Sequence, residues 1–381
     1  MLSVLLTPLA SPPWWLAHGH SYAGSWRANP QRSGTPLFYD EQCLDHSAPN
    51  DERLERLWSQ RYYEDLTSWG GAGYPVFISL GGEGPAYGPP SGLQQQLAET
   101  HRAALITLEH RFYGESWPTE NMSAANLRHL SADQALADAV QFIAWWSEEH
   151  GSLNSSWVSW GGSYSGQLSA WLRLRYPTSV AGAVAYSAPV LSQLDFFQYD
   201  EVTTAVLSAM GGAVCTQRLR QAFEEAVAAL AEDAPPGRDR AIDLLHACTR
   251  PNSTDDDAIL TGSAMGRVQS LVQYNDPSSA HSIASFCAAG EAAAKTGASA
   301  LEALGAMLRE MSDRRCLVSS LEAYMAPLRD ANFTTGTPTI RQYYWQLCNE
   351  VSGCRRARAP CPPSETASPP GASLLRSATP P

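Results

Sequence analysis

The sequence predicts an α/β fold followed by a helical domain, and three observations support this prediction. First, short apolar runs at 74–80, 103–108, 157–160 and 180–186 have the length and composition of buried strands. Second, amphipathic helical segments separate these runs, which favours a mostly parallel sheet covered by helices on both faces. Third, beyond about residue 200 apolar residues recur at helical spacing and no strand pattern interrupts them.

The composition restricts the class of protein. With 381 residues, 44% of them hydrophobic, the chain can bury one large core or two smaller ones. Its formal net charge of −12 argues against nucleic acid as a partner, because nucleic-acid-binding surfaces are basic. No apolar run reaches the roughly 20 residues that a membrane-spanning helix requires, so no transmembrane span is expected.

The first domain is expected over residues 37–200. Residues 1–36 start with a short apolar segment without the basic flank of a good signal peptide, and we interpret them as leader and loop. Aromatic and polar residues alternate within 37–69 as in the edge strands of an antiparallel hairpin. The amphipathic segment 131–150 should form a helix capped by Ser131.

A helical cap domain is expected over residues 201–350. Ala and Leu are prominent in its periodic segments, and the expected helices cover 201–210, 216–232, 238–248, 290–312 and 316–329. Beyond them, residues 351–381 are rich in Pro, Ser, Ala and Thr, so they are predicted to be a disordered tail.

The segment around Ser163 carries the clearest functional signal. A buried strand breaks at Gly161 and Gly162, and a helical segment begins directly after Ser163. A serine on such a strand-to-helix turn is the nucleophile elbow of the α/β-hydrolase fold, and the crowded turn requires small neighbours. Ser165 stands where the usual pattern has glycine, and Gly166 follows it. We therefore predict that Ser163 is a catalytic nucleophile; the alternative is an ordinary serine in a turn.

A glycine-rich turn, Gly81-Gly-Glu-Gly-Pro85, follows the strand at 74–80. Such a turn after a central strand lets backbone N–H groups point into a cavity, and in the α/β-hydrolase fold it supplies one half of the oxyanion hole. It is not a phosphate loop, since no Gly-Lys-Ser/Thr follows. A plain tight turn is the alternative.

Three histidines are candidates for the catalytic base. His110 lies in Glu109-His-Arg111 and precedes the serine, whereas the α/β-hydrolase order is serine, acid, histidine. A structural role that pairs loops beneath the site is therefore favoured for this cluster. His246 lies beside two leucines and His281 in a Ser/Ala-rich connection, so packing or surface roles are favoured for both.

Sequons and cysteines favour the secretory pathway. The glycosylation acceptors are Asn121, Asn154, Asn252 and Asn332. The eight cysteines lack the close paired spacing of a zinc site, so no metal is expected and disulfides are favoured over buried free thiols. Four of the cysteines fall within the helical region, at positions 215, 248, 287 and 316. A lysosomal, endosomal or secreted destination is expected.

Several motifs together resemble the prolyl-peptidase family of serine hydrolases. The resemblance runs from about residue 37 to 351, and its pieces are Gln42-Cys-Leu-Asp-His46, Gln60-Arg-Tyr62, Gly81-Gly-Glu-Gly84, Glu109-His-Arg-Phe-Tyr-Gly-Glu-Ser116, Gln134-Ala-Leu-Ala-Asp138, Gly161-Gly-Ser-Tyr-Ser-Gly166, Ser187-Ala-Pro189, Leu194-Asp-Phe-Phe-Gln-Tyr199 and Tyr343-Tyr-Trp-Gln-Leu-Cys348. It implies a serine-type exopeptidase that cuts peptides beside proline through an acyl-enzyme, without a cofactor. It also implies that Ser163 attacks, and that the N–H of Tyr164 and one N–H of the Gly82/Glu83 turn bind the oxyanion.

Family members continue through an Asn-Gly-x-x-Asp-Pro-Trp segment with the triad aspartate and then a histidine, and neither motif is found here. The resemblance therefore predicts an α/β-hydrolase fold with an inserted helical cap whose C-terminal strands are absent, and it identifies no triad Asp or His in this chain. Two hypotheses follow: a serine peptidase that acts on peptide substrates, or a truncated, non-catalytic product that binds peptides or is inactive. A lipase or esterase is less favoured, because the turn at residue 81 lacks their His-Gly-Gly-Gly form. The end of the peptide that is trimmed, the disulfide connectivity and the oligomeric state are left open.

Overall fold

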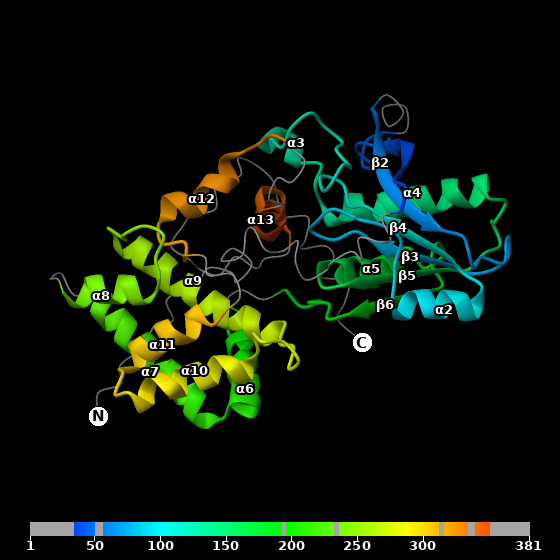
Figure 1. The fold of residues 1–381 in the computed structure, drawn as a ribbon. Coiled ribbons are helices and arrows are strands. Elements are labelled where there is room, and N and C mark those ends of the chain that lie inside the picture. Colours follow the sequence, from blue (N-terminus) through cyan, green and yellow to red (C-terminus); the bar gives the residue numbers. More distant parts are fainter. Residues whose placement is uncertain are drawn as a thin grey trace, which may run out of the picture. The chain divides into compact units, whose positions relative to one another are not determined.

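The computed structural model describes residues 34–49, 56–192, 196–231, 236–311, 316–333 and 340–350 (Figure 1). The chain divides into two compact units. The first includes residues 27–194 and 330–354 and is called the sheet unit; the second includes residues 195–329 and is called the helical unit. Residues 1–33 of the expected leader and loop at 1–36 lie outside the described residues, as does the expected tail at 351–381.

The sheet unit contains a six-stranded sheet in the order β1-β2-β4-β3-β5-β6. Its strands are β1 (Leu37–Cys43), β2 (Leu57–Asp65), β3 (Val76–Leu80), β4 (Ala104–Leu108), β5 (Trp157–Gly162) and β6 (Gly182–Tyr186). β4, β3, β5 and β6 run parallel, whereas β1 and β2 form an antiparallel hairpin joined antiparallel to β4. This order confirms the predicted mixed sheet with an antiparallel edge. Among the described residues, no named strand follows β6.

Helices cover both faces of this sheet. The helices of the unit are α2 (Leu93–His101), α3 (Ala124–Leu127), α4 (Ala132–Glu149), α5 (Tyr164–Arg175) and α13 (Ile340–Asn349). Alternate residues of β3 face opposite sides: Val76 and Ile78 lie in one apolar cluster with residues of α4 and α5, while Phe77 packs in another with Ala98 of α2. The predicted cap is also found, since the Ser131 hydroxyl accepts a hydrogen bond from the N–H of Gln134 at the start of α4.

The helical unit is held by one apolar core and two disulfides. Its helices are α6 (Gln198–Gly211), α7 (Ala213–Leu230), α8 (Gly237–Leu244), α9 (Thr254–Gln273), α10 (Ile283–Lys295), α11 (Ala300–Arg309) and α12 (Leu321–Arg329). Disulfides join Cys215 to Cys287 and Cys248 to Cys316, which confirms the expectation of disulfides for these four cysteines. Each bridge closes a long loop, with sequence separations of 72 and 68 residues, so both restrict the unfolded chain strongly.

The structure differs from the predicted helical cap in four places. The helix expected over 316–329 begins only at Leu321. The single helix expected over 290–312 is two helices, because Gly297 has a positive φ of 83° and Ser299 caps the next one. Helix α9 was not predicted; it buries small and polar residues such as Gly262 and Ser263 as well as apolar ones, which weakens the periodic signal. Segment 340–350, expected in the cap, belongs to the sheet unit, where Gln346 hydrogen-bonds to two of its tyrosines.

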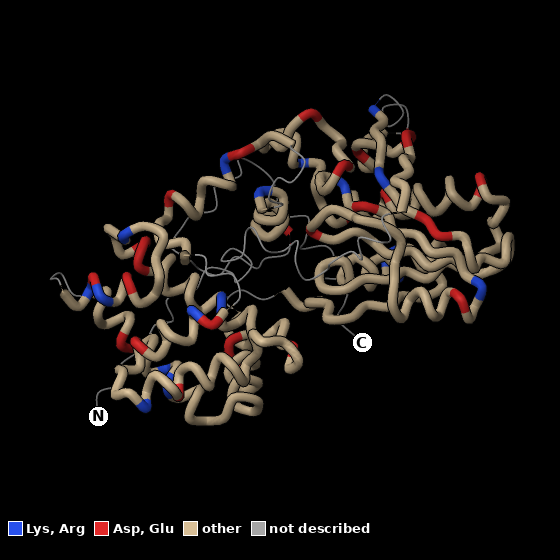
Figure 2. Tube along the Cα trace, in the orientation of Figure 1, with Lys and Arg blue, Asp and Glu red and all other residues tan. Residues whose placement is uncertain are grey.

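Charged residues are distributed over both units. Figure 2 shows acidic and basic positions interspersed along the helices and the strands, so the net charge of −12 is not concentrated on one element. Within the described ranges, no helix has both the length and the apolar character needed to cross a bilayer.

Candidate active site

Ser163 lies at the tip of a sharp turn between β5 and α5. Its backbone has φ 56° and ψ −130°, a left-handed conformation that a non-glycine residue adopts only under constraint. Two backbone hydrogen bonds hold it there: Ser163 N–H donates to the carbonyl of Tyr186 at 3.1 Å, and its own carbonyl accepts from Gln167 N–H at 3.1 Å. Ser163 is exposed while Tyr164 and Ser165 are buried, so an accessible hydroxyl stands on a rigid support.

Small residues are required around this turn. A Cβ on Gly161 would lie 2.1 Å from the carbonyl oxygen of Ser165, and a Cβ on Gly166 would lie 3.0 Å from the carbonyl oxygen of Gly161. The clash at Gly161 is with backbone, which cannot move without opening the turn, and a Cβ on Gly166 would also lie 2.9 Å from the Cβ of Ala188. The local geometry is therefore that of the nucleophile elbow that the sequence predicts.

The glycine-rich turn after β3 lies next to the first turn of α5. Ser165 Oγ donates a hydrogen bond to the carbonyl of Leu80 at 2.5 Å, and a Cβ on Gly82 would come within 3.5 Å of Ser165 Cβ. Ser165 thus has a function that glycine, the usual residue at this position, could not perform: it ties the elbow helix to the end of β3. Glu83 is half-buried in the same turn, and burial raises the pKa of its carboxyl.

The Glu109/His110/Arg111 cluster has the structural role that the sequence favours. Glu109 accepts hydrogen bonds from Arg61 Nη2 at 2.5 Å and from Ser116 Oγ at 2.8 Å. Arg111 makes a two-pronged pair with Asp138 of α4, at 2.6 and 2.5 Å. Burial alone would raise the pKa of Asp138, but the Arg111 guanidinium outweighs it and holds this pKa below its usual range.

The three candidate histidines occupy different surroundings. His110 is buried, and burial lowers its pKa to about 4, so the ring is neutral at neutral pH. His246 and His281 are exposed on the helical unit, as expected for surface residues, and His281 Nδ1 donates to the carbonyl of Glu310. Among the described residues of the sheet unit, no side chain hydrogen-bonds to Ser163 Oγ, and this part of the chain assigns no general base.

Sequence reasoning missed two residues that shape the site. The carbonyl of Tyr186 accepts a hydrogen bond from the N–H of Ser163. A Cβ on Gly162 would lie only 2.3 Å from the ring of Tyr186. Gln346 of α13 donates to the phenol oxygen of Tyr164, although 182 positions separate the two residues. Tyr186 could have been found as the end of the neighbouring parallel strand, but nothing in the sequence indicates that Gln346 faces the elbow.

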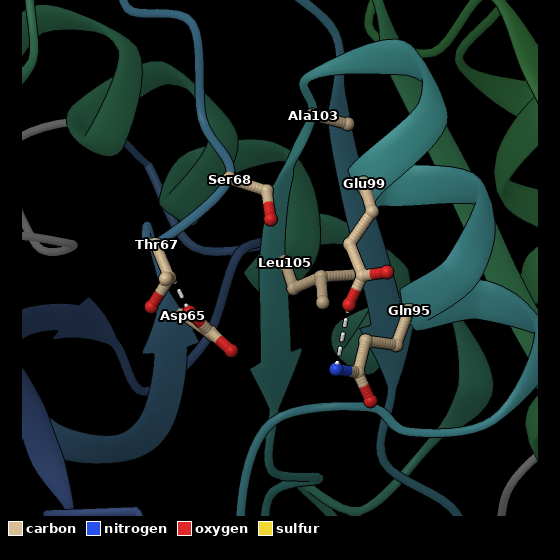
Figure 3. Close-up of a pocket in the computed structure, with 7 residues that line it drawn as sticks. All are labelled: Asp65, Thr67, Ser68, Gln95, Glu99, Ala103 and Leu105. Carbon is tan, nitrogen blue, oxygen red and sulfur yellow. Dashed lines mark hydrogen bonds between the residues drawn. The ribbon is translucent and has the colours of Figure 1, made fainter.

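A pocket of about 190 Å³ lies elsewhere in the sheet unit (Figure 3). It is lined by Asp65, Thr67, Ser68, Gln95, Glu99, Ala103 and Leu105, and Gln95 Nε2 donates to Glu99 within it. Asp65 ends β2 and Leu105 is the second residue of β4, so the pocket is at the amino ends of the parallel strands, opposite the edge that carries Ser163. It therefore contributes nothing to the candidate active site.

The four sequons lie on the surface to different degrees. Asn154, Asn252 and Asn332 are exposed, whereas Asn121 is only partly exposed. The Asn121 side-chain oxygen accepts from the N–H of Ser123 at 2.9 Å, which fixes its amide in a local turn.

Comparison with known proteins gives a consistent family. The family described as serine carboxypeptidase S28 matches residues 42–369, a range that includes part of the expected tail. Human thymus-specific serine protease is 33% identical over 336 residues, which cover 84% of this chain and 64% of that protein. Lysosomal Pro-X carboxypeptidase of Bos taurus is 32% identical over 228 residues, covering 58% of this chain and 45% of that protein. The chain thus spans less than two thirds of the length of these relatives.

Among solved structures, proline iminopeptidase of Mycobacterium smegmatis matches with a TM-score of 0.31 and 16% identity, over 57% of this chain and 67% of that one.

Proposed function

Because the chain belongs to the serine carboxypeptidase S28 family, we propose that it is a serine peptidase that trims peptides beside proline. The observation that carries this proposal is the exposed hydroxyl of Ser163 at a left-handed turn between β5 and α5. A serine held in this way can approach a peptide carbonyl without moving the backbone that supports it. The α/β architecture and the small residues around the turn support the same assignment.

In the proposed reaction, Ser163 Oγ attacks the carbonyl carbon and its proton passes to a general base, for which the described residues of the sheet unit supply no candidate. The carbonyl oxygen becomes an oxyanion, which accepts hydrogen bonds from the N–H of Tyr164 and from one N–H of the Gly82/Glu83 turn. The C–N bond then breaks, the amine leaves with the proton, and water hydrolyses the acyl-enzyme. The proximity of Gly82 to Ser165 supports this pairing of donors, because it brings the turn beside the residue that follows Tyr164.

The proline preference rests on the bovine relative, whose name specifies Pro-X bonds. Peptides matched except for proline or alanine at the residue before the cleaved bond would test it, and the proline peptide should be cut faster. Exopeptidase action predicts that blocking one terminus stops cleavage while blocking the other does not. Equal cleavage of peptides blocked at both ends would refute it.

The proposed location is the secretory pathway, in a lysosomal, endosomal or secreted form. Two disulfides in the helical unit and three exposed sequons support an oxidising compartment. The alternative of a truncated, non-catalytic product has no support from the family match or from the relatives.

Labelling with a fluorophosphonate probe tests the nucleophile directly. The full chain should be labelled at Ser163, and the variant Ser163→Ala should lose all labelling. Ser169→Ala is the matched control, since it removes a buried hydroxyl from the same helix and should be labelled as the unchanged protein is. Labelling that survives Ser163→Ala would exclude Ser163 as the nucleophile.

A further inference from the structure

A chain of buried polar side chains lies behind the nucleophile elbow, and the proposed reaction does not use it. Tyr113 donates its hydroxyl to Gln346 Oε1 at 2.5 Å, and Gln346 Nε2 donates to the phenol oxygen of Tyr164 at 2.5 Å. His110 Nε2 lies 3.1 Å from the same phenol oxygen, and His110 Nδ1 lies 2.7 Å from the carbonyl oxygen of Arg111. The side chains that form this hydrogen-bond series are all buried.

The direction of each hydrogen bond follows from the chemistry of the groups. The carbonyl of Arg111 can only accept, so His110 Nδ1 carries the proton. Burial lowers the pKa of His110 to about 4, which leaves Nε2 bare and able to accept. The Tyr164 hydroxyl therefore donates to His110 Nε2 while it accepts from Gln346. Each hydrogen bond of the series then has one donor and one acceptor, and the other neutral tautomer of His110 would leave two acceptors facing each other at Arg111.

This series holds Tyr164, whose backbone N–H is one of the two proposed oxyanion donors. Tyr164 is the first residue of α5 and directly follows Ser163, so its phenol is fixed at one end and its N–H lies at the other. Helix α13 is itself anchored, because Gln342 Nε2 donates to the carbonyl of Phe112 at 3.0 Å. The polar series thus joins α13 and the loop after β4 to the start of the elbow helix.

We propose that His110 and Gln346 are positioning residues that orient Tyr164 so that its backbone N–H binds the oxyanion. The inference rests on the proposed serine-peptidase function. Neither side chain contacts the reacting atoms: both act through the Tyr164 phenol. In this role His110 is a fixed hydrogen-bond acceptor and never exchanges a proton with substrate, which separates it from the general base.

A pair of ligands separates positioning of the oxyanion donor from simple support of the fold. A dipeptide boronate with boron in place of the proline carboxyl carbon forms an anionic adduct: Ser163 Oγ bonds to boron, the hydroxyl proton passes to solvent, and boron becomes tetrahedral. The corresponding dipeptide amide binds without an oxyanion. Dissociation constants of both ligands are measured by calorimetry on the full chain, for the unchanged protein and for Tyr164→Phe and Gln346→Met.

Tyr39→Phe is the matched control. It also removes a buried phenol that accepts one side-chain hydrogen bond, from Gln141 at 2.9 Å, but it lies on β1 away from the elbow. Thermal unfolding of each variant establishes that it is folded.

The expected result is a loss of about tenfold in boronate affinity for Tyr164→Phe and Gln346→Met, with amide affinity unchanged. This loss is smaller than the roughly 100-fold effect of deleting an oxyanion donor, because the N–H is still present but less well held. Tyr39→Phe should change neither constant.

Four outcomes would overturn the proposal. Unchanged boronate affinity in folded Tyr164→Phe and Gln346→Met would show that the Tyr164 N–H does not need the hydrogen-bond series to bind the oxyanion. Equal losses for both ligands, or failure of both variants to fold, would assign it to support of the structure alone. If the unchanged protein binds boronate no better than Ser163→Ala does, the serine-peptidase function itself fails, and this result is distinguishable from the others.

Discussion

Replacing Gly161 by alanine tests the steric account of the elbow. A Cβ at this position would lie 2.1 Å from the carbonyl oxygen and 2.3 Å from the carbonyl carbon of Ser165. Because the obstructing atoms are backbone, no side chain can rotate away, and the turn must open or the strand must shift. Forcing extra volume into a packed site costs about 1–3 kcal/mol and occasionally more. We expect the upper end, about 3 kcal/mol, and loss of fluorophosphonate labelling because Ser163 is displaced.

Gly182→Ala provides the matched control for Gly161→Ala. Gly182 lies on the neighbouring strand β6, and a Cβ there would meet no atom within 4 Å. Its substitution should be neutral or stabilise by about 0.4–1 kcal/mol, since alanine has less backbone entropy to lose on folding.

Thermal unfolding followed by tryptophan fluorescence measures both variants. Residues 195–329 contain no tryptophan, so the signal follows mainly the sheet unit. A cost of about 3 kcal/mol corresponds to a fall in Tm of roughly 6–12 °C for a unit of this size. Equal Tm values for Gly161→Ala and Gly182→Ala, with labelling intact in both, would refute the steric account.

Three further predictions concern stability and modification. Because Arg111 lowers the pKa of Asp138, the ionised carboxylate stabilises the fold above its unfolded pKa of about 4. This stability should be lost as the pH falls below about 4. In unfolding measured from pH 3 to 7, Asp138→Asn should flatten the dependence of stability on pH. Reduction of the two disulfides of the helical unit should lower its stability by up to about 4 kcal/mol for each loop, seen as an earlier far-UV circular dichroism transition, while the tryptophan signal of the sheet unit stays nearly unchanged. In a secreted preparation, Asn154→Gln should shift the gel mobility by one glycan. Asn121→Gln should give a smaller shift, because the Asn121 amide is partly buried and held in a turn. Equal shifts for the two variants would contradict this reasoning.

Local patterns in the sequence were sufficient to predict much of the sheet unit. The apolar runs at 74–80 and 103–108 became β3 and β4, and Ser131 begins α4 as its cap position predicts. The elbow was predictable for the same reason: its signal is a strand, two glycines, a serine and a helix in direct succession, and no distant residue is needed to recognise it.

Helical boundaries in the second unit were less predictable, because they depend on weak signals. Periodicity alone joined α10 and α11 into one helix, although Gly297 and the Ser299 capping box mark the break between them. In α9 the buried face includes Gly262, Ser263 and Gln269, so apolar spacing identifies only part of the face that packs. Here burial by tertiary contacts outweighs the hydrophobic pattern on which the prediction relied.

The position of α13 could not be predicted from the sequence, and this limit has a functional consequence. The segment 340–349 was not predicted to be a helix, and its sequence does not indicate which surface it covers. Gln346 is 182 positions from Tyr164 and 233 positions from Tyr113 in the sequence. Only folding of the sheet unit brings these groups together. The elbow therefore has two kinds of support: a local turn, which requires Gly161, and a long-range hydrogen-bond series, which requires Gln346. If only the turn mattered, Gln346→Met would leave the oxyanion donor unaffected, so the boronate comparison measures how much of the site depends on contacts that no local motif records.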